Sequence, residues 1–189
     1  DFQHVIEETS FTGETTKNVY DEHQDLVSSV DGNGNETTYI YDGQHRLLQS
    51  TYHDIVTSYT YDALGRTIAI HTSHDDKSTY TAYDAKGNVI SETDKNGNTV
   101  THAYDGKNQE ISTTDGRGNT STKEYDAFGN IIKETDANGN IRQTKYNAFN
   151  MKEMEVDERG FSTTYIYDEQ LRLKELVGKF DETTRYVYN

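Results

Sequence analysis

The sequence of 189 residues contains no cysteine, no proline and no tryptophan. Without cysteine the chain forms neither disulfides nor thiolate zinc sites, and it has no cysteine nucleophile. Apolar runs are also short, and none approaches the roughly 20 residues of a membrane-spanning helix. These absences exclude a disulfide scaffold, a zinc finger and a helical membrane span.

Basic residues are scarce as well. The chain has 18 Lys and Arg against 33 Asp and Glu, a formal net charge of −15, and the basic residues form no cluster. Recognition of nucleic acids needs Lys and Arg that face phosphates, so the composition opposes a nucleic-acid partner. The acidic excess is typical of a solvated surface that keeps a protein soluble.

Aliphatic residues are few for a chain of this charge, a combination that by itself favours disorder. The 15 tyrosines argue the other way, because each ring buries a large area. We therefore expect a thin, tyrosine-rich β structure without a thick globular core.

An internal repeat dominates the sequence. A tyrosine followed by Asp or Asn recurs in steps of 20 to 22 residues. This phase runs from one end of the chain to the other, without a linker. It predicts a single array of about nine 21-residue repeats over residues 1–189, and a chain starting at Asp1 without Met is expected to be a fragment of a larger protein. The repeated tyrosines are Tyr20, Tyr41, Tyr61, Tyr83, Tyr104, Tyr125, Tyr146, Tyr167 and Tyr188.

Each repeat translates into two short strands and two tight turns. The first turn follows the tyrosine as Asp-x-x-Gly, where Asp accepts backbone N–H groups and Gly tolerates positive φ. The second turn carries Asn-Gly, a strong hairpin signal, and the intervening segments are rich in Thr, Val, Ile and Tyr. This pattern predicts an antiparallel meander of about 18 strands. The turn residues expected to be structural are Asp42, Asp62, Asp84, Asp126, Gly65, Gly87 and Gly129 in the first turn, and Gly97 and Gly139 in the second.

Pairs of the form Tyr-x-Tyr place two rings on one face of a strand. Because equivalent positions of stacked repeats become neighbours, these rings are expected to align in a tyrosine ladder. The face that carries them should be the more buried one. Residues 72–78 interrupt the pattern with one extra residue, which predicts a bulge or a longer loop there.

The octet Tyr59-Thr60-Tyr61-Asp62-Ala63-Leu64-Gly65-Arg66, its counterpart ending at Gly129-Asn130 and the period near 21 resemble the RHS or YD-repeat family over the whole chain. Late repeats depart from this signature, with Asn150 and Leu171 in place of Gly. The resemblance implies an all-β fold of stacked antiparallel hairpins that form a curled sheet or partial hollow shell. It further implies a non-catalytic wall segment of an exported or cell-wall-associated bacterial protein, which encloses a toxin or effector domain carried in cis.

Other chemical interpretations stay open with less support. The Asp-x-Asn-Gly-Asn turns offer oxygen ligands as a calcium loop does, but the glycine position differs and no bidentate Glu follows. His71 and His74 lie beside Asp75 and Asp76 as a candidate metal pair. Abundant carboxylates permit glycoside hydrolysis, yet residues that recur with the repeat are more simply structural. No cofactor or resident metal is predicted.

The expected partners follow from the exposed surfaces. Tyrosine and asparagine side chains on an exposed face suit a neutral glycan or a cell-surface protein, the main alternative to the wall function. The edge strands near Val5–Ile6 and Arg185–Tyr188 are expected to pair end to end with another copy, or to close into a ring.

Overall fold

The computed structural model describes residues 4–11 and 13–188, so Asn189 of the last repeat lies outside the described residues. These residues form 18 β-strands and one short 3₁₀ helix, η1 (Lys179–Asp181). None of the helical segments described could span a membrane. The strands are β1 (His4–Thr9), β2 (Thr15–Tyr20), β3 (Leu26–Val30), β4 (Glu36–Tyr41), β5 (Leu47–Tyr52), β6 (Ile55–Tyr61), β7 (Thr67–Thr72), β8 (Lys77–Tyr83), β9 (Val89–Thr93), β10 (Thr99–Tyr104), β11 (Glu110–Thr114), β12 (Thr120–Tyr125), β13 (Ile131–Thr135), β14 (Ile141–Tyr146), β15 (Lys152–Val156), β16 (Ser162–Tyr167), β17 (Leu173–Val177) and β18 (Thr183–Arg185).

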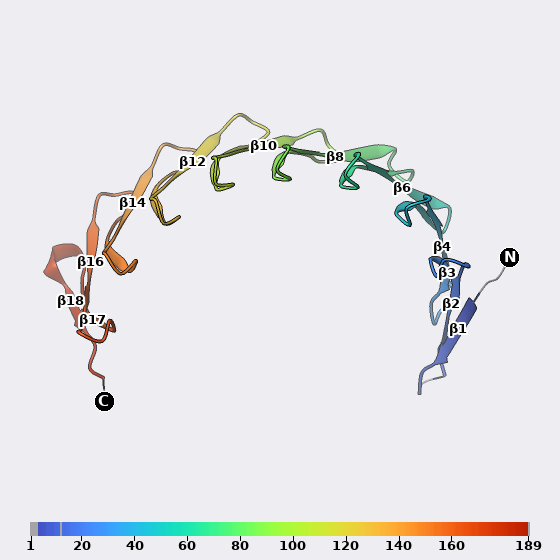
Figure 1. Cartoon of the computed structure of the whole chain (residues 1–189), viewed down its shortest axis with the longest axis horizontal. Helices are drawn as coiled ribbons and strands as arrows, with labels where there is room; N and C mark the ends of the chain where they lie inside the picture. The colour runs from blue at the N-terminus through green and yellow to red at the C-terminus, as the bar shows by residue number, and fades with distance from the viewer. Residues whose placement is uncertain (1–3, 12, 189) are drawn as a thin grey trace. The chain divides into compact units, whose positions relative to one another are not determined.

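Residue contacts group the chain into two compact units. The first comprises residues 1–83 and 91–99, and the second residues 84–90 and 100–189. In the first unit each strand from β1 to β8 pairs antiparallel with the next. In the second unit the strands from β10 to β18 do the same. Consecutive strands therefore follow one another in chain order within each unit (Figure 1). The all-β prediction of stacked antiparallel hairpins is confirmed.

A β-bulge recurs where the repeated tyrosine meets the following strand. In the β10–β11 pair, Ala103 lies opposite Ser112, whereas Tyr104 lies opposite Glu110, so that Ile111 is the extra residue. The same shift occurs beside Tyr20, Tyr41, Tyr61, Tyr125, Tyr146 and Tyr167. A bulge increases the local twist of a strand and turns backbone groups out of the regular ladder.

The sheet has one better-covered face and no deeply buried core. Among the described residues none is fully enclosed by its neighbours. In β4 the side chains of Tyr39 and Tyr41 are half-buried, while Thr38 and Ile40 of the opposite face are exposed. The tyrosine-bearing face is thus the more buried one, as expected from the Tyr-x-Tyr pattern.

Two turns account for the repeats that are not 21 residues long. Between β7 and β8 the chain makes a four-residue loop, because Thr72 pairs with Lys77, and this confirms the longer loop predicted within residues 72–78. Between β5 and β6, Tyr52 pairs with Ile55, which leaves a two-residue turn at His53-Asp54. Both of these turn residues have positive φ, 45° and 64°. This is the backbone of a type I′ turn, in which Asn-Gly is the preferred pair.

Replacing His53-Asp54 by Asn-Gly is expected to stabilise this hairpin by about 1 kcal/mol, because Asn and Gly adopt left-handed φ at lower cost. Urea unfolding of the two proteins gives the difference in free energy. The matched control is the same replacement at Ala137-Asn138, where neither residue has positive φ. Equal effects at the two turns would contradict the prediction.

Candidate functional site

The turn after each repeated tyrosine is built around the carboxylate of its aspartate. In the turn that begins at Asp62, Oδ1 accepts the backbone N–H groups of Leu64 at 2.9 Å and Arg66 at 3.0 Å. The N–H of Gly65 donates to the Asp62 carbonyl at 3.0 Å, and Gly65 has a φ of 81°. This is a β-turn followed by a left-handed residue, a common three-residue hairpin loop.

The other predicted first-turn residues occupy the same geometry. Oδ1 accepts from the second and fourth following residues at 2.8 and 3.0 Å for Asp42, 2.8 and 2.9 Å for Asp84, and 2.9 and 2.9 Å for Asp126. Gly87 and Gly129 have φ values of 96° and 92°. Left-handed φ is what makes glycine the favoured residue at this position.

The second turn of each repeat has this same architecture, which the sequence did not indicate. Asp94 Oδ1 accepts the N–H groups of Asn96 at 2.8 Å and Asn98 at 2.9 Å. Gly97, and not Asn96, takes the left-handed conformation, and Gly139 does so in the equivalent turn. The Asn-Gly pair therefore does not form a two-residue turn. In these examples an aspartate and a left-handed glycine three residues later define both turns.

The calcium interpretation gains no support from these turns. The second carboxylate oxygen of Asp94 accepts the side-chain amide of Asn98 at 2.8 Å, so both oxygens are already hydrogen-bonded within the turn. His71 contacts Ser78 at 3.2 Å and Asp76 at 3.7 Å, and His74 joins neither contact. Throughout the part of the chain that the structure describes, no three His, Cys, Asp or Glu side chains gather as metal ligands would.

The hydroxyl groups of six repeated tyrosines tie their repeats to the preceding one. Tyr125 donates its O–H to the carbonyl of Glu110 at 2.7 Å. Glu110 is the residue opposite Tyr104 at the bulge, so the bulged strand presents the acceptor. Five further tyrosines bond the carbonyl at the same place in the preceding repeat: Tyr61 to Leu47, Tyr83 to Thr67, Tyr104 to Val89, Tyr167 to Lys152 and Tyr188 to Leu173.

Arginine side chains fill the space against three of these rings. The guanidinium carbon of Arg46 lies 4.9 Å from the ring centre of Tyr61, and those of Arg66 and Arg172 lie 4.5 Å from Tyr83 and Tyr188. Each arginine comes from the turn of the preceding repeat, where Arg46 and Arg66 are also paired with an aspartate at 2.6 Å. At these three positions the contact between successive repeats is therefore a guanidinium group against a tyrosine ring. The shared sequence signal is an arginine five residues after a repeated tyrosine, and of the three only Arg66 is preceded by glycine.

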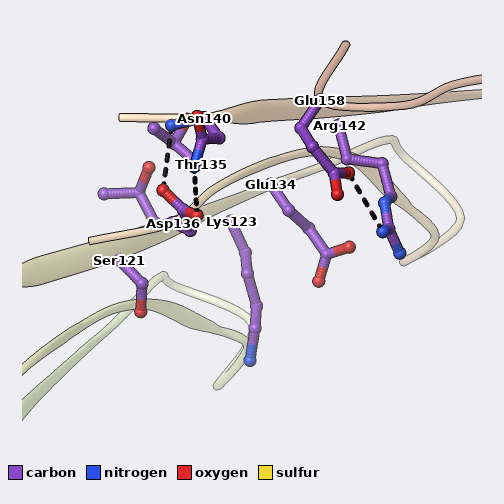
Figure 2. A pocket seen from close by; sticks show the side chains of 9 residues that line it. Ser121, Lys123, Glu134, Thr135, Asp136, Asn140, Arg142 and Glu158 are labelled. Carbon is purple, nitrogen blue, oxygen red and sulfur yellow. Dashed lines mark hydrogen bonds and ion pairs between the residues drawn. The ribbon is translucent and has the colours of Figure 1, made fainter. Parts of the chain in front are cut away.

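A shallow pocket of about 310 Å³ lies over β12, β13 and β14 in the second unit (Figure 2). Lys123, Glu134 and Arg142 stand opposite one another on these strands and form a row of alternating charge. Lys123 is bonded to Glu110 at 2.9 Å and Arg142 to Glu158 at 3.2 Å. The row can hold the polar groups of an extended chain or a polyol.

The electrostatics of the carboxylates do not favour acid catalysis. A hydrogen bond from Lys123 lowers the pKa of Glu110, and hydrogen bonds from its own backbone N–H and from Arg142 lower that of Glu158. Turn hydrogen bonds do the same for the aspartates, with the Arg66 backbone N–H acting most strongly on the pKa of Asp62. A glycosidase acid needs a raised pKa. Among the described residues, every carboxyl group with a shifted pKa has it lowered.

Hairpins of one kind, docked through tyrosine, aspartate and arginine, define a β-hairpin repeat protein. The RHS Repeat family model matches residues 20–54, 83–120 and 104–141. The chain belongs to the RHS-repeat family, and the resemblance seen in the sequence is confirmed.

Solved structures show the same fold in much longer chains. The crystal structure of TcdB2-TccC3-Cdc42 matches 90% of this chain with a TM-score of 0.55 at 19% identity, over 10% of its own chain. The crystal structure of TcdB2-TccC3-TEV matches 92% with a TM-score of 0.52 at 15% identity, over 12% of its own chain. The chain therefore spans about a tenth of the length of these proteins. No curated protein matches it at a significant level.

Proposed function

We propose that the chain is a non-catalytic wall segment of a large exported protein, and that the wall screens a toxin or effector domain carried in cis. Membership in the RHS-repeat family supports this proposal. The fold also matches about a tenth of a much longer solved chain. In such a protein the 21-residue repeats would continue as one array and curl into part of a hollow shell.

The observation that carries the proposal is that the polar side chains repeated along the sequence form hydrogen bonds within the strip itself. The tyrosine hydroxyls bond the backbone of the preceding repeat, and the aspartates bond their own turns. On this basis we assign structural roles to the repeated tyrosines, to Asp42, Asp62, Asp84 and Asp126, and to the turn glycines Gly65, Gly87, Gly97, Gly129 and Gly139. Side chains used in this way hold a surface together, and they have the same role in successive repeats.

The test is protease protection of the cis domain in the full-length parent protein. We expect that domain to resist cleavage in the natural protein and to be cut rapidly in a Tyr104→Ala/Tyr125→Ala variant, which opens adjacent hairpins. Phe128→Ala is the matched control, because Phe128 is 84% exposed at a turn and its loss leaves the hairpin contacts intact. Equal cleavage of the domain in the natural protein and the double variant would refute a screening wall.

A second function, binding of a neutral glycan at a bacterial cell surface, is favoured by one cavity. It measures about 440 Å³ in the first unit and is lined by Tyr80, Arg66, Asp62 and Ser91, among others. Tyr80 is 55% exposed and lies on the face opposite the repeated tyrosines. An open aromatic ring beside hydrogen-bonding groups is a common platform for a sugar. A cell-surface protein could use the same platform.

Binding of neutral oligosaccharides on an array, measured for the natural chain and for Tyr80→Ala, separates the two functions. Saturable binding that Tyr80→Ala abolishes supports the adhesion module. Absence of saturable binding leaves the wall function.

Sedimentation of the natural chain over a range of concentrations tests the separate prediction of end-to-end pairing through β1 and β18, which a strictly monomeric species would contradict.

A further inference from the structure

Successive tyrosine turns meet through two positions that recur in every repeat. One is the fifth residue after a repeated tyrosine, here called the fifth position. The other is the left-handed residue of the next tyrosine turn, four residues after its tyrosine, here called the fourth position. The first lies at the end of one turn and the second at the tip of the next, so one side chain can reach the other.

Where the fifth position holds a short polar residue, the fourth position of the next turn is not glycine. The carboxylate of Asp25 accepts a hydrogen bond from His45 Nδ1 at 2.6 Å, and Asn88 donates to Asn108 at 3.2 Å. Asn130 likewise donates to the side chain of Asn150. The residues His45, Asn108 and Asn150 have φ values of 61°, 64° and 63°. Each left-handed side chain is thus met by a hydrogen-bonding partner on the preceding turn.

Where the fifth position holds a long polar residue, the fourth position is glycine, whereas the apolar Met151 precedes a turn tipped by the apolar Leu171. Arg46 extends over Gly65, with its Nη1 atom 3.7 Å from the place a Cβ would occupy. Gln109 extends over Gly129, with its Nε2 atom 3.1 Å from that place. A side chain at either glycine would meet the residue that reaches across from the preceding turn, in addition to the strain of left-handed φ.

We infer that a polar residue at the fifth position of a repeat selects the fourth position of its neighbour, so that this edge of the strip is a recognition surface for one kind of hairpin. A repeat with Asn or Asp at the fifth position accepts a turn tipped by Asn or His. A repeat with Arg or Gln accepts a turn tipped by glycine. The order of the repeats is therefore specified by contacts between neighbours, and this holds whatever the strip encloses or binds.

A double-mutant cycle at Gln109 and Gly129 in the full chain tests the inference. Gly129→Asn alone is expected to lower the folding equilibrium constant, because the new side chain meets Gln109. Gln109→Asn/Gly129→Asn recreates the pair found at Asn88 and Asn108, and is expected to recover about tenfold of that loss relative to additivity. Unfolding in urea measures each variant.

Gly139→Asn is the matched control. Gly139 has nearly the same backbone conformation, with a φ of 84°, but nothing lies within 4 Å of its Cβ position. The cycle of Gln109→Asn with Gly139→Asn should therefore be additive. Additivity at Gly129 as well would overturn the inference, because the loss would then come from backbone strain alone.

A reciprocal cycle avoids new side chains at glycine. Asn88→Arg alone should destabilise the chain, because the longer side chain meets Asn108. Asn88→Arg/Asn108→Gly recreates the arrangement of Arg46 and Gly65 and should recover about tenfold relative to additivity. If Gly129→Asn does not fold, this cycle decides the question, and additive effects in it would refute the inference.

Discussion

Tyr125→Ala is expected to lower the free energy of unfolding by about 3 kcal/mol. The substitution removes a half-buried ring, whose loss in protein cores costs about 3–5 kcal/mol, and the hydroxyl that bonds the Glu110 carbonyl at 2.7 Å. Tyr125→Phe keeps the ring and loses only the hydrogen bond, so it should cost about 1 kcal/mol. Chemical denaturation followed by far-UV circular dichroism measures both values.

The control for this series is Tyr80→Ala, which removes the same side chain from a position that is 55% exposed on the opposite face. Its effect should stay within about 0.5 kcal/mol, as for surface substitutions without special contacts. Similar losses at Tyr80 and Tyr125 would show that the repeated tyrosine is not the contact that joins repeats.

Acid is expected to unfold the chain in a steep transition below about pH 4. Turn hydrogen bonds lower the folded-state pKa of the repeated aspartates, with the side chain of Asn98 the largest cause at Asp94 and that of Asn130 at Asp126. A carboxyl group with a lowered folded-state pKa stabilises the protein above its unfolded pKa, near 3.9, and that stability disappears as the pH falls through the folded pKa. Because the group recurs in almost every turn, several protons are bound on unfolding.

One turn of the chain shows that asparagine can replace the aspartate, and this suggests a test of whether the aspartates cause the acid unfolding. Asn147 occupies the aspartate position of its turn, and its Oδ1 accepts the N–H groups of Phe149 and Met151 at 2.9 and 3.0 Å. Asp62→Asn, Asp94→Asn and Asp126→Asn should therefore preserve the turns while fewer protons are bound on unfolding. If the free energy of unfolding of the triple variant falls equally steeply with acid, groups other than these aspartates cause the acid unfolding. His45 acts in the opposite sense, since the hydrogen bond to Asp25 raises its pKa and stabilises the protein at low pH.

The sequence was informative wherever the physical cause lies within one repeat. A segment rich in Thr and Tyr predicted β4, a segment with Val and Ile predicted β9, and Asp-x-x-Gly predicted the turn at Asp62. The extra residue in residues 72–78 predicted the loop between β7 and β8. All of these depend on neighbours within about five residues, which a single sequence displays directly.

Contacts between repeats were much harder to predict from the sequence. The bulge beside Tyr104, the place of Arg66 on Tyr83 and the bond from Asn88 to Asn108 each join residues on different strands or turns. The left-handed conformation of Gln24 and Leu171 could not be predicted from the sequence either, because these residue types rarely adopt it. The surrounding turn imposes it, with the aspartate carboxylate holding the two N–H groups on either side of the tip.

The tyrosine hydrogen bonds reach back only 14 to 16 residues along the chain. Side-chain hydrogen bonds between successive turns join positions 20 apart, as from His45 to Asp25, Lys86 to Gly106 and Lys107 to Ala127. Loop closure over such short distances costs little entropy, and proteins dominated by local contacts fold quickly. A growing polypeptide can therefore complete each hairpin against the one just made, so synthesis or export from one end would build the strip in order without waiting for distant segments.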